Sequence, residues 1–217
     1  MSEITAPNAP APSSTTTADP QAAARRRPKP GERRVQILQT LAAMLEQPGA
    51  ERITTAALAR QLAVSEAALY RHFASKAQMF EALIEFIETS VFTLVNQIHE
   101  RADAAAGGGA QSAARIVSMV LQFGERNPGM VRVMVGDALV FEHERLQQRM
   151  NLFFDKLEAQ LRQCLRLQGG AAAPAAQAQV RAGVLGDLIR GRLQRYARSG
   201  FRQPPTQHLD ETLALLL

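Results

Sequence analysis

The sequence of 217 residues contains a single cysteine, Cys164, and no tryptophan. One thiol excludes a disulfide within the chain and is typical of proteins in a reducing compartment. There is no run of about 18 uncharged apolar residues, which a membrane-spanning helix would need. The N-terminus also lacks the basic and apolar stretches of a secretion signal. These absences predict a cytoplasmic protein with no membrane partner.

Motifs that would indicate catalysis or a bound cofactor are missing as well. The four histidines are His72, His99, His143 and His208. None of them has a cysteine or histidine neighbour at the spacing of metal ligands. No nucleophile-elbow, dinucleotide-binding or P-loop pattern occurs. Cys164 has no obvious base beside it, so a thiol nucleophile is not expected. The sequence therefore predicts a protein that is not an enzyme and needs no cofactor or metal.

The positive charge of the chain is concentrated in one segment. The hydrophobic fraction of 46% is enough for a buried core, and the net charge is +5. Between Arg25 and Lys76, ten lysines and arginines stand against four glutamates, a balance of +6. A basic segment can be merely a solvated face. One that coincides with a recognition motif indicates binding to nucleic acid.

Apolar periodicity divides the chain into a tail and a series of helices. Residues 1–31, rich in alanine, proline, serine and threonine, are predicted to form a disordered arm. Helices are predicted over 35–45, 75–100, 112–126, 136–167, 177–199 and from 206 onward, with loops over 102–111 and 169–178. No segment shows sustained strand alternation. The expected fold class is all-α, with a domain boundary after residue 76 and a helical body over 77–217.

Residues 53–76 carry the pattern of a helix-turn-helix. Thr54 or Thr55 can cap a short first helix, and Ser65 can cap the second after a turn at 63–65. The inward positions of both helices are apolar or small: Leu58, Ala59, Leu62, Ala68, Leu69 and Phe73. An ordinary helical hairpin would share this periodicity. Together with the basic charge, the pattern favours a three-helix DNA-binding domain over 32–76.

The second helix of this motif would present its outward residues to a major groove, while neighbouring polar groups would hold the phosphates. The candidate DNA-binding residues are Thr54, Thr55, Ser65, Glu66, Ala67, Tyr70, Arg71, His72 and Lys76. Because phosphate contacts displace counterions, affinity for DNA should fall steeply with salt.

These residues carry a family resemblance. Thr54-Thr55, Leu58-Ala59, Val64-Ser65, residues 69–73 and Ser75-Lys76 resemble the DNA-binding domain of the TetR family, whose members are all-helical homodimers with a variable body. Within that family the chain is most similar to the nucleoid occlusion factors over residues 33–205. The similarity is carried by the sequences SEAALYRHF at 65–73, LIEFIE at 83–88, FGERNPG at 123–129 and LEAQLRQ at 157–163.

The resemblance implies a two-fold homodimer on near-palindromic chromosomal sites, associated with the nucleoid, that antagonises assembly of the division protein FtsZ. It also implies an FtsZ-facing surface made by Phe86, Met119, Gln122, Arg126 and Asn127. The chain departs from the family pattern at Leu94, where arginine is expected, and at Gln122, where glycine is expected. By helical geometry Phe86 lies about 120° from the centre of the core stripe. It could therefore either pack against the first helix or belong to a docking site.

Dimerisation is expected from a later stripe, Leu185, Leu188, Ile189, Leu193 and Tyr196. The glycines at 183, 186 and 191 would allow close helix contact, or would mark a frayed helix.

Two other functions fit the same fold: a transcriptional repressor gated by a small-molecule inducer, and a ligand-independent regulator. Residues that could line an inducer pocket, or equally be ordinary core, are Met119, Phe123, Met130, Met134, Phe141 and Phe153.

Overall fold

The computed structural model describes residues 31–47, 52–104, 108–166 and 174–217, and the predicted disordered arm lies outside these ranges apart from Gly31. Its elements are α1 (Glu32–Leu45), α2 (Thr55–Gln61), α3 (Glu66–Tyr70), α4 (Lys76–Ala104), α5 (Gly109–Arg126), α6 (Pro128–Met134), the 3-10 helix η1 (Asp137–Leu139), α7 (Glu144–Arg166), α8 (Ala175–Arg198) and α9 (Leu209–Leu216). Every regular element in the described ranges is helical, which confirms the predicted all-α class. None of the described helices is long and apolar enough to cross a membrane.

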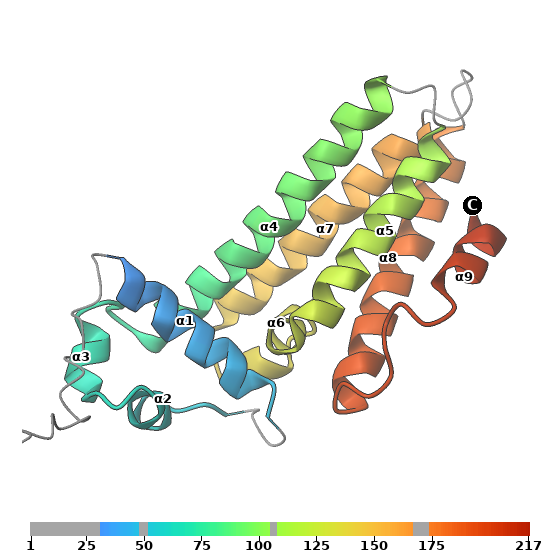
Figure 1. Ribbon diagram of the computed structural model, residues 1–217. Coiled ribbons are helices and arrows are strands. Elements are labelled where there is room, and N and C mark those ends of the chain that lie inside the picture. The colour runs from blue at the N-terminus through green and yellow to red at the C-terminus, as the bar shows by residue number, and fades with distance from the viewer. Residues whose placement is uncertain (1–30, 48–51, 105–107, 167–173) are drawn as a thin grey trace, which may run out of the picture.

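The long helices α4, α5, α7 and α8 run alongside one another and form the body, while α1, α2 and α3 form a small unit at one end (Figure 1). We call this unit, residues 32–75, the reader. Helix α4 begins beside the reader and continues into the body, where it contacts α5 and α7. The short helix α6 lies against α1, so α1, α4 and α6 meet where the two parts join.

Two side chains cap the start of α4. The Ser75 hydroxyl accepts a hydrogen bond from the Gln78 amide at 3.2 Å. The Gln78 side chain reaches back and accepts from the Ala74 amide at 3.0 Å, one residue before the position of a standard capping box. Satisfying these free amides sets the first turn of α4 and hence the direction in which the helix leaves the reader.

Two predicted elements differ in the structure. The helix expected over 136–167 begins only at Glu144, because Gly136 takes a left-handed conformation (φ +86°) and is followed by η1 and a turn. No helix was predicted between 126 and 136, but Pro128 begins α6 there. Proline suits this first helical position, since its missing N–H would be unpaired there in any case. With seven residues, α6 is too short for its periodicity to be recognised.

The junction between reader and body is tightly packed. A Cβ atom built on Gly129 of α6 would lie 2.0 Å from the carbonyl oxygen of Ala42 in α1, so only glycine permits this approach. Within the reader, the Arg34 guanidinium lies 4.1 Å from the centre of the Phe73 ring and donates to the His72 carbonyl oxygen at 2.5 Å. These contacts join α1 to α6 on one side and to the end of α3 on the other.

The segment after α8 is held against the body by a buried arginine. Arg192 donates to the carbonyl oxygens of Pro205 and Gln207, at 2.9 and 2.7 Å, and to the Thr212 hydroxyl at 2.7 Å. The Thr206 hydroxyl in turn donates to the Glu125 carboxylate at 2.5 Å. These hydrogen bonds place α9 beside α5 and α8.

Candidate DNA-binding and partner-binding sites

The two short helices of the reader begin at the predicted capping residues. Thr54 accepts from the Ala57 amide at 3.1 Å, and Ser65 accepts from the Ala68 amide at 3.2 Å. Between them Ala63 adopts a left-handed conformation (φ +52°), which turns the chain from α2 into α3. Thr55 does not cap. Its hydroxyl donates to the Glu66 carboxylate at 2.6 Å and links the starts of the two helices.

The outer face of α3 is open to solvent. Glu66, Ala67 and Arg71 are exposed, and Tyr70 is 46% exposed. On the inner side the structure buries Leu58, Ala59, Leu69 and Phe73, and it half-buries Leu62 and Ala68. An exposed helix face with a cation and a phenol has the form needed to enter a major groove.

The remaining two candidates for DNA contact, His72 and Lys76, are half-buried. Lys76 forms an ion pair with Glu142, in the turn before α7, and its ammonium lies 5.6 Å from the centre of the Phe80 ring. His72 is half-buried, and its carbonyl accepts the hydrogen bond from Arg34. Lys76 would therefore have to leave Glu142, or share it, to reach a phosphate.

A groove of about 420 Å³ runs along the junction between reader and body. Its lining residues are Val35, Leu38, Gln39, Ala42, Ala43 and Glu46 from α1, Leu83 and Phe86 from α4, and Asn127 and Met130 from the α5–α6 corner and α6. Phe86 is 49% exposed. It therefore lies beside α1 and is at the same time available to a partner, which reconciles the two alternatives considered from the sequence.

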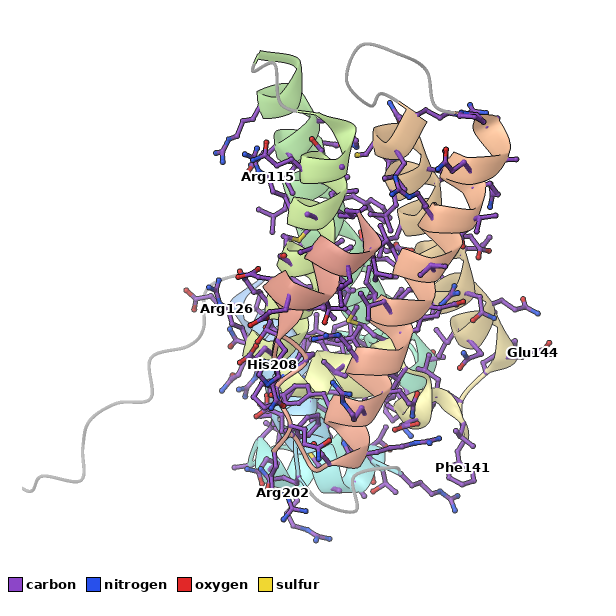
Figure 2. All side chains as sticks on the ribbon, turned by 90° about the vertical axis from the view of Figure 1, so that its right-hand side faces the viewer. Arg115, Arg126, Phe141, Glu144, Arg202 and His208 are labelled. Carbon is purple, nitrogen blue, oxygen red and sulfur yellow. The ribbon has the colours of Figure 1, made fainter. Side chains whose placement is uncertain are left out.

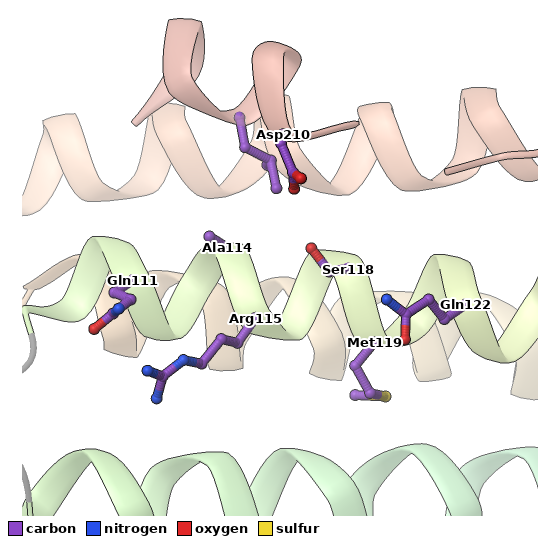
Figure 3. A pocket seen from close by; sticks show the side chains of 8 residues that line it. Gln111, Ala114, Arg115, Ser118, Met119, Gln122 and Asp210 are labelled. Carbon is purple, nitrogen blue, oxygen red and sulfur yellow. The ribbon is translucent and has the colours of Figure 1, made fainter. Parts of the chain in front are cut away.

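A second hollow, of about 510 Å³, lies between α5 and α9 (Figure 3). Its lining residues are Gln111, Ala114, Arg115, Ser118, Met119, Gln122, Asp210 and Leu213. Figure 3 shows that Arg115 and Met119 project from α5 toward α4, while Asp210 projects from α9 toward α5. This hollow is wide and mostly polar in its side chains, unlike the groove at the junction.

Four of the five residues of the predicted FtsZ surface line one or the other hollow, and the role of all five in binding FtsZ stays a prediction. Phe86 and Asn127 line the junction groove, whereas Met119 and Gln122 line the second hollow. Arg126 is exposed at the end of α5 and projects from the surface (Figure 2). The Asn127 side chain donates to the Phe123 carbonyl oxygen at 2.7 Å and so closes the end of α5.

Comparisons with known proteins agree with this architecture. The model of bacterial regulatory proteins of the TetR family matches residues 37–83, and the tetracyclin repressor-like, C-terminal domain of SlmA-like type matches residues 111–217. The nucleoid occlusion factor SlmA of Photobacterium profundum is 48% identical over 193 residues, which cover 87% of this chain and 95% of that protein. SlmA of Vibrio cholerae serotype O1 is 47% identical over 188 residues, 85% of this chain and 93% of that one.

The chain belongs to the SlmA family of nucleoid occlusion factors. This confirms the prediction of a TetR-type DNA-binding protein. Solved structures also share the fold. FadR of Bacillus subtilis, in complex with stearoyl-CoA, superposes with a TM-score of 0.65 at 15% identity, covering 84% of this chain and 96% of that one. A TetR-family regulator of Bordetella parapertussis gives 0.65 at 21%, covering 86% and 95%.

The stripe predicted for dimerisation of this SlmA-family chain lies in the protomer's own core. Leu185, Ile189, Leu193 and Tyr196 are buried, and Leu188 is half-buried. These side chains face the inside of the body because α8 packs on α5, α6 and α7. A core-facing stripe and an interface stripe have the same helical period, so the sequence alone could not distinguish them.

The residues considered for an inducer pocket do not converge on one cavity in this SlmA-family protein. Phe153 and Met134 are buried in the core, and Met130 lines the junction groove. Phe141 is exposed in the turn before α7, where the Arg52 guanidinium lies 5.8 Å from its ring centre.

Cys164 is buried and lies 3.9 Å from Nδ1 of His99, whose Nε2 contacts the Gln160 side-chain oxygen at 2.9 Å. Burial raises the pKa of the Cys164 thiol to about 11, so the thiol is protonated at neutral pH. Over the described residues, no group of three or more histidine, cysteine or acidic side chains is placed to hold a metal ion.

Proposed function

We propose that this SlmA-family chain, as a two-fold dimer bound to near-palindromic chromosomal sites through α3, antagonises FtsZ polymer assembly over the nucleoid. The observation that carries the proposal is the junction groove, which has one wall in the DNA-reading unit and the other in the body. The proposed DNA-binding residues of the protein remain those of the helix-turn-helix. Glu66, Ala67, Tyr70 and Arg71 would face the bases, and Thr54 and Thr55 would face phosphates.

The groove suits a short segment of FtsZ. Phe86 and Val35 are both large, apolar and about half exposed, a combination that marks interaction sites. A volume of about 420 Å³ accommodates a few side chains. Glu46 and Asn127 add polar groups at its walls. We infer that apolar side chains of an FtsZ segment enter the groove beside Phe86.

The position of the groove also explains how DNA could increase the effect on FtsZ. Because α1 moves with the reader, only one relative position of reader and body keeps both groove walls in place. DNA that holds the two readers of a dimer in register would favour that position, and FtsZ bound in the groove would favour it too. By linkage, each partner would then bind more tightly in the presence of the other.

The test is sedimentation of FtsZ polymer with GTP, with the protein added alone, with a duplex carrying its selected site, or with a scrambled duplex of equal length. We expect the site duplex to make the protein deplete polymer, and the protein alone or with scrambled DNA to do so weakly. Unchanged polymer, although the protein binds its site tightly, would exclude FtsZ antagonism and leave a transcriptional regulator.

For the homodimer we propose the outer face of α7 and α8 as the interface. The two helices lie side by side (Figure 2). Their outer residues Leu152, Val180 and Val184 are apolar and 57%, 67% and 45% exposed. A Cβ on Gly183 or Gly191 would meet no atom within 4 Å, so a facing helix could come close there. Removing such apolar area from water would favour association.

A charge in this face should break the dimer. We expect Val184→Asp to run as a monomer in analytical ultracentrifugation at micromolar concentration, because two-fold symmetry buries two carboxylates for each substitution. Folding should be preserved, since Val184 is already half exposed. The matched control is Leu215→Asp on α9, which is 87% exposed and should leave the dimer intact. A Val184→Asp protein that remains dimeric would place the interface elsewhere.

A further inference from the structure

The end of α8 and the segment that follows it carry an unusual run of charge of one sign. From residue 188 to residue 209 the sequence contains no aspartate or glutamate. The arginines in that stretch are Arg190, Arg192, Arg195, Arg198 and Arg202. The segment from Arg25 to Lys76 accounts for the basic excess of the chain as a whole, so this second cluster needs an explanation of its own.

Two of these arginines have structural roles. Arg190 lies 4.7 Å from the centre of the Phe154 ring and pairs with Asp155 at 3.8 Å. Arg192 is buried and holds the segment before α9 through its three hydrogen bonds. Both arginines therefore already have partners within the protomer.

The other three arginines are exposed and have no carboxylate partner. Arg195 and Arg198 form no side-chain hydrogen bond or ion pair with any described residue, and the side chain of Arg202 donates only to the Ser199 carbonyl oxygen, at 2.9 Å. We call these three the basic edge. Desolvation and the nearby charge of Arg195 lower the pKa of Arg192, so positive charges already repel one another here.

Charged groups behind the basic edge do not neutralise it. Arg132 of α6 is buried beneath it, 5.1 Å from the centre of the Phe201 ring, and its Nε has no hydrogen-bond partner among the described residues. The carboxylates near this end of α8 are Glu46, Glu125 and Asp137. Glu125 accepts from Thr206, and Asp137 accepts from Gln194 at 3.5 Å. Five arginines, counting Arg132 and Arg192, thus face three carboxylates.

The basic edge lies at the DNA-reading end of the molecule. Figures 1 and 2 share a vertical axis, and in both the end of α8 reaches the level of the reader helices, with Arg202 labelled there in Figure 2. A duplex bound to α3 would lie at this end of the molecule. The phosphates of that duplex would bring dense negative charge close to the unpaired guanidinium groups of the basic edge.

We propose that Arg195, Arg198 and Arg202 form a second, sequence-independent DNA contact, borne by the body, that binds phosphates while the reader binds its site. This goes beyond the proposed action on FtsZ and does not depend on it. The contact adds affinity and salt dependence without adding base preference, because phosphate contacts are the same for every sequence. It also ties the body directly to the duplex.

The test is the salt dependence of binding to a flanked site duplex, measured by fluorescence anisotropy for wild type and for the triple variant Arg195→Gln, Arg198→Gln, Arg202→Gln. The slope of log affinity against log salt should become shallower by about 0.9 for each phosphate that the variant no longer binds, hence by up to about 3 per protomer. Affinity should fall about tenfold or more, and the ratio of specific to scrambled binding should stay unchanged. If the triple variant unfolds at a lower temperature than wild type, the three single variants are measured instead. Each is expected to make the slope shallower by about 0.9 per protomer.

The matched control removes three exposed arginines from the other end of the body, where α4 and α7 end and α5 begins (Figure 1): Arg101→Gln, Arg115→Gln and Arg166→Gln. The net charge then changes equally, and the slope should remain that of wild type. An unchanged slope in the basic-edge variant, or an equal change in both triple variants, would overturn the proposal. Binding to phosphatidylglycerol vesicles is measured as well. If the wild-type protein binds them, and the basic-edge variant does not bind them but keeps the wild-type DNA slope, the basic edge faces a membrane and the proposal is wrong.

Discussion

Replacing Gly129 by alanine should lower the melting temperature of the protein and separate the reader from the body. The added Cβ would lie 2.0 Å from the carbonyl oxygen and 2.9 Å from the carbonyl carbon of Ala42. Both atoms are backbone, so no side chain can rotate to make room. Helix α1 would have to move away from α6 by more than an ångström, because ordinary van der Waals contact begins at 3.4 Å.

Overpacking of this kind costs about 1–3 kcal/mol. In a protein of this length each kcal/mol lowers the melting temperature by about 2–4 °C, so we expect a fall of about 2–12 °C in calorimetry. The displaced α1 also carries one wall of the junction groove, and the effect on FtsZ should therefore decline with stability. Gly108→Ala is the control. Its Cβ would meet no atom within 4 Å, and its melting temperature should match wild type. Equal melting temperatures of the two variants would show that α1 and α6 can move apart at the junction without loss of stability.

Replacing Phe86 by alanine should separate DNA binding from action on FtsZ. Phe86 lines the junction groove on α4, half exposed, and does not belong to the reader. Buried aromatic anchors at interfaces lose about 2–4 kcal/mol on truncation. That corresponds to a loss of affinity for FtsZ of about 30-fold to 1,000-fold. Affinity for the site duplex should stay within a factor of two of wild type by anisotropy, and folding stability should change by less than about 0.5 kcal/mol.

The control for Phe86→Ala is Leu215→Ala, which removes an exposed apolar side chain from α9. The control should deplete FtsZ polymer as wild type does in the presence of the site duplex. A Phe86→Ala protein that still depletes polymer would place FtsZ outside the junction groove, with the second hollow between α5 and α9 as the next site to test. Loss of DNA affinity in the same variant would instead mean that Phe86 supports the reader.

The distribution of the expected FtsZ-binding residues over the two hollows has a geometric cause. Helix α5 ends at Arg126 with Asn127 folded back onto Phe123, and the chain then turns into α6. Residues before that turn, such as Met119 and Gln122, line the second hollow, whereas Asn127 lines the junction groove. Leu94 on α4 is 38% exposed and lines neither hollow. The departure from the family at Leu94 therefore leaves the walls of both hollows unchanged, while that at Gln122 alters the second.

Local features of the reader and the all-α class could be predicted from the sequence. Thr54, Ser65 and Ser75 act as caps because a hydroxyl one turn before free amides satisfies them wherever the helix lies. The inward face of α2 and α3 follows from helical period, which is also a local property. Lys76 shows the limit of such reasoning. Its ion pair joins it to Glu142, 66 positions away, and no local pattern contains that contact.

Only the tertiary structure decided which apolar stripe faces inward and which residues make a groove. Leu185 and Ile189 share their period with an interface, but the packing of α8 on α5 and α7 buries them, leaving Val180 and Val184 outside. The junction groove depends on α1 and α6 approaching through Gly129, a contact between segments more than 80 residues apart. Capping hydrogen bonds and helical periodicity act within a few residues and could therefore be predicted from the sequence. Surfaces are made by the approach of distant helices and had to be found in the fold.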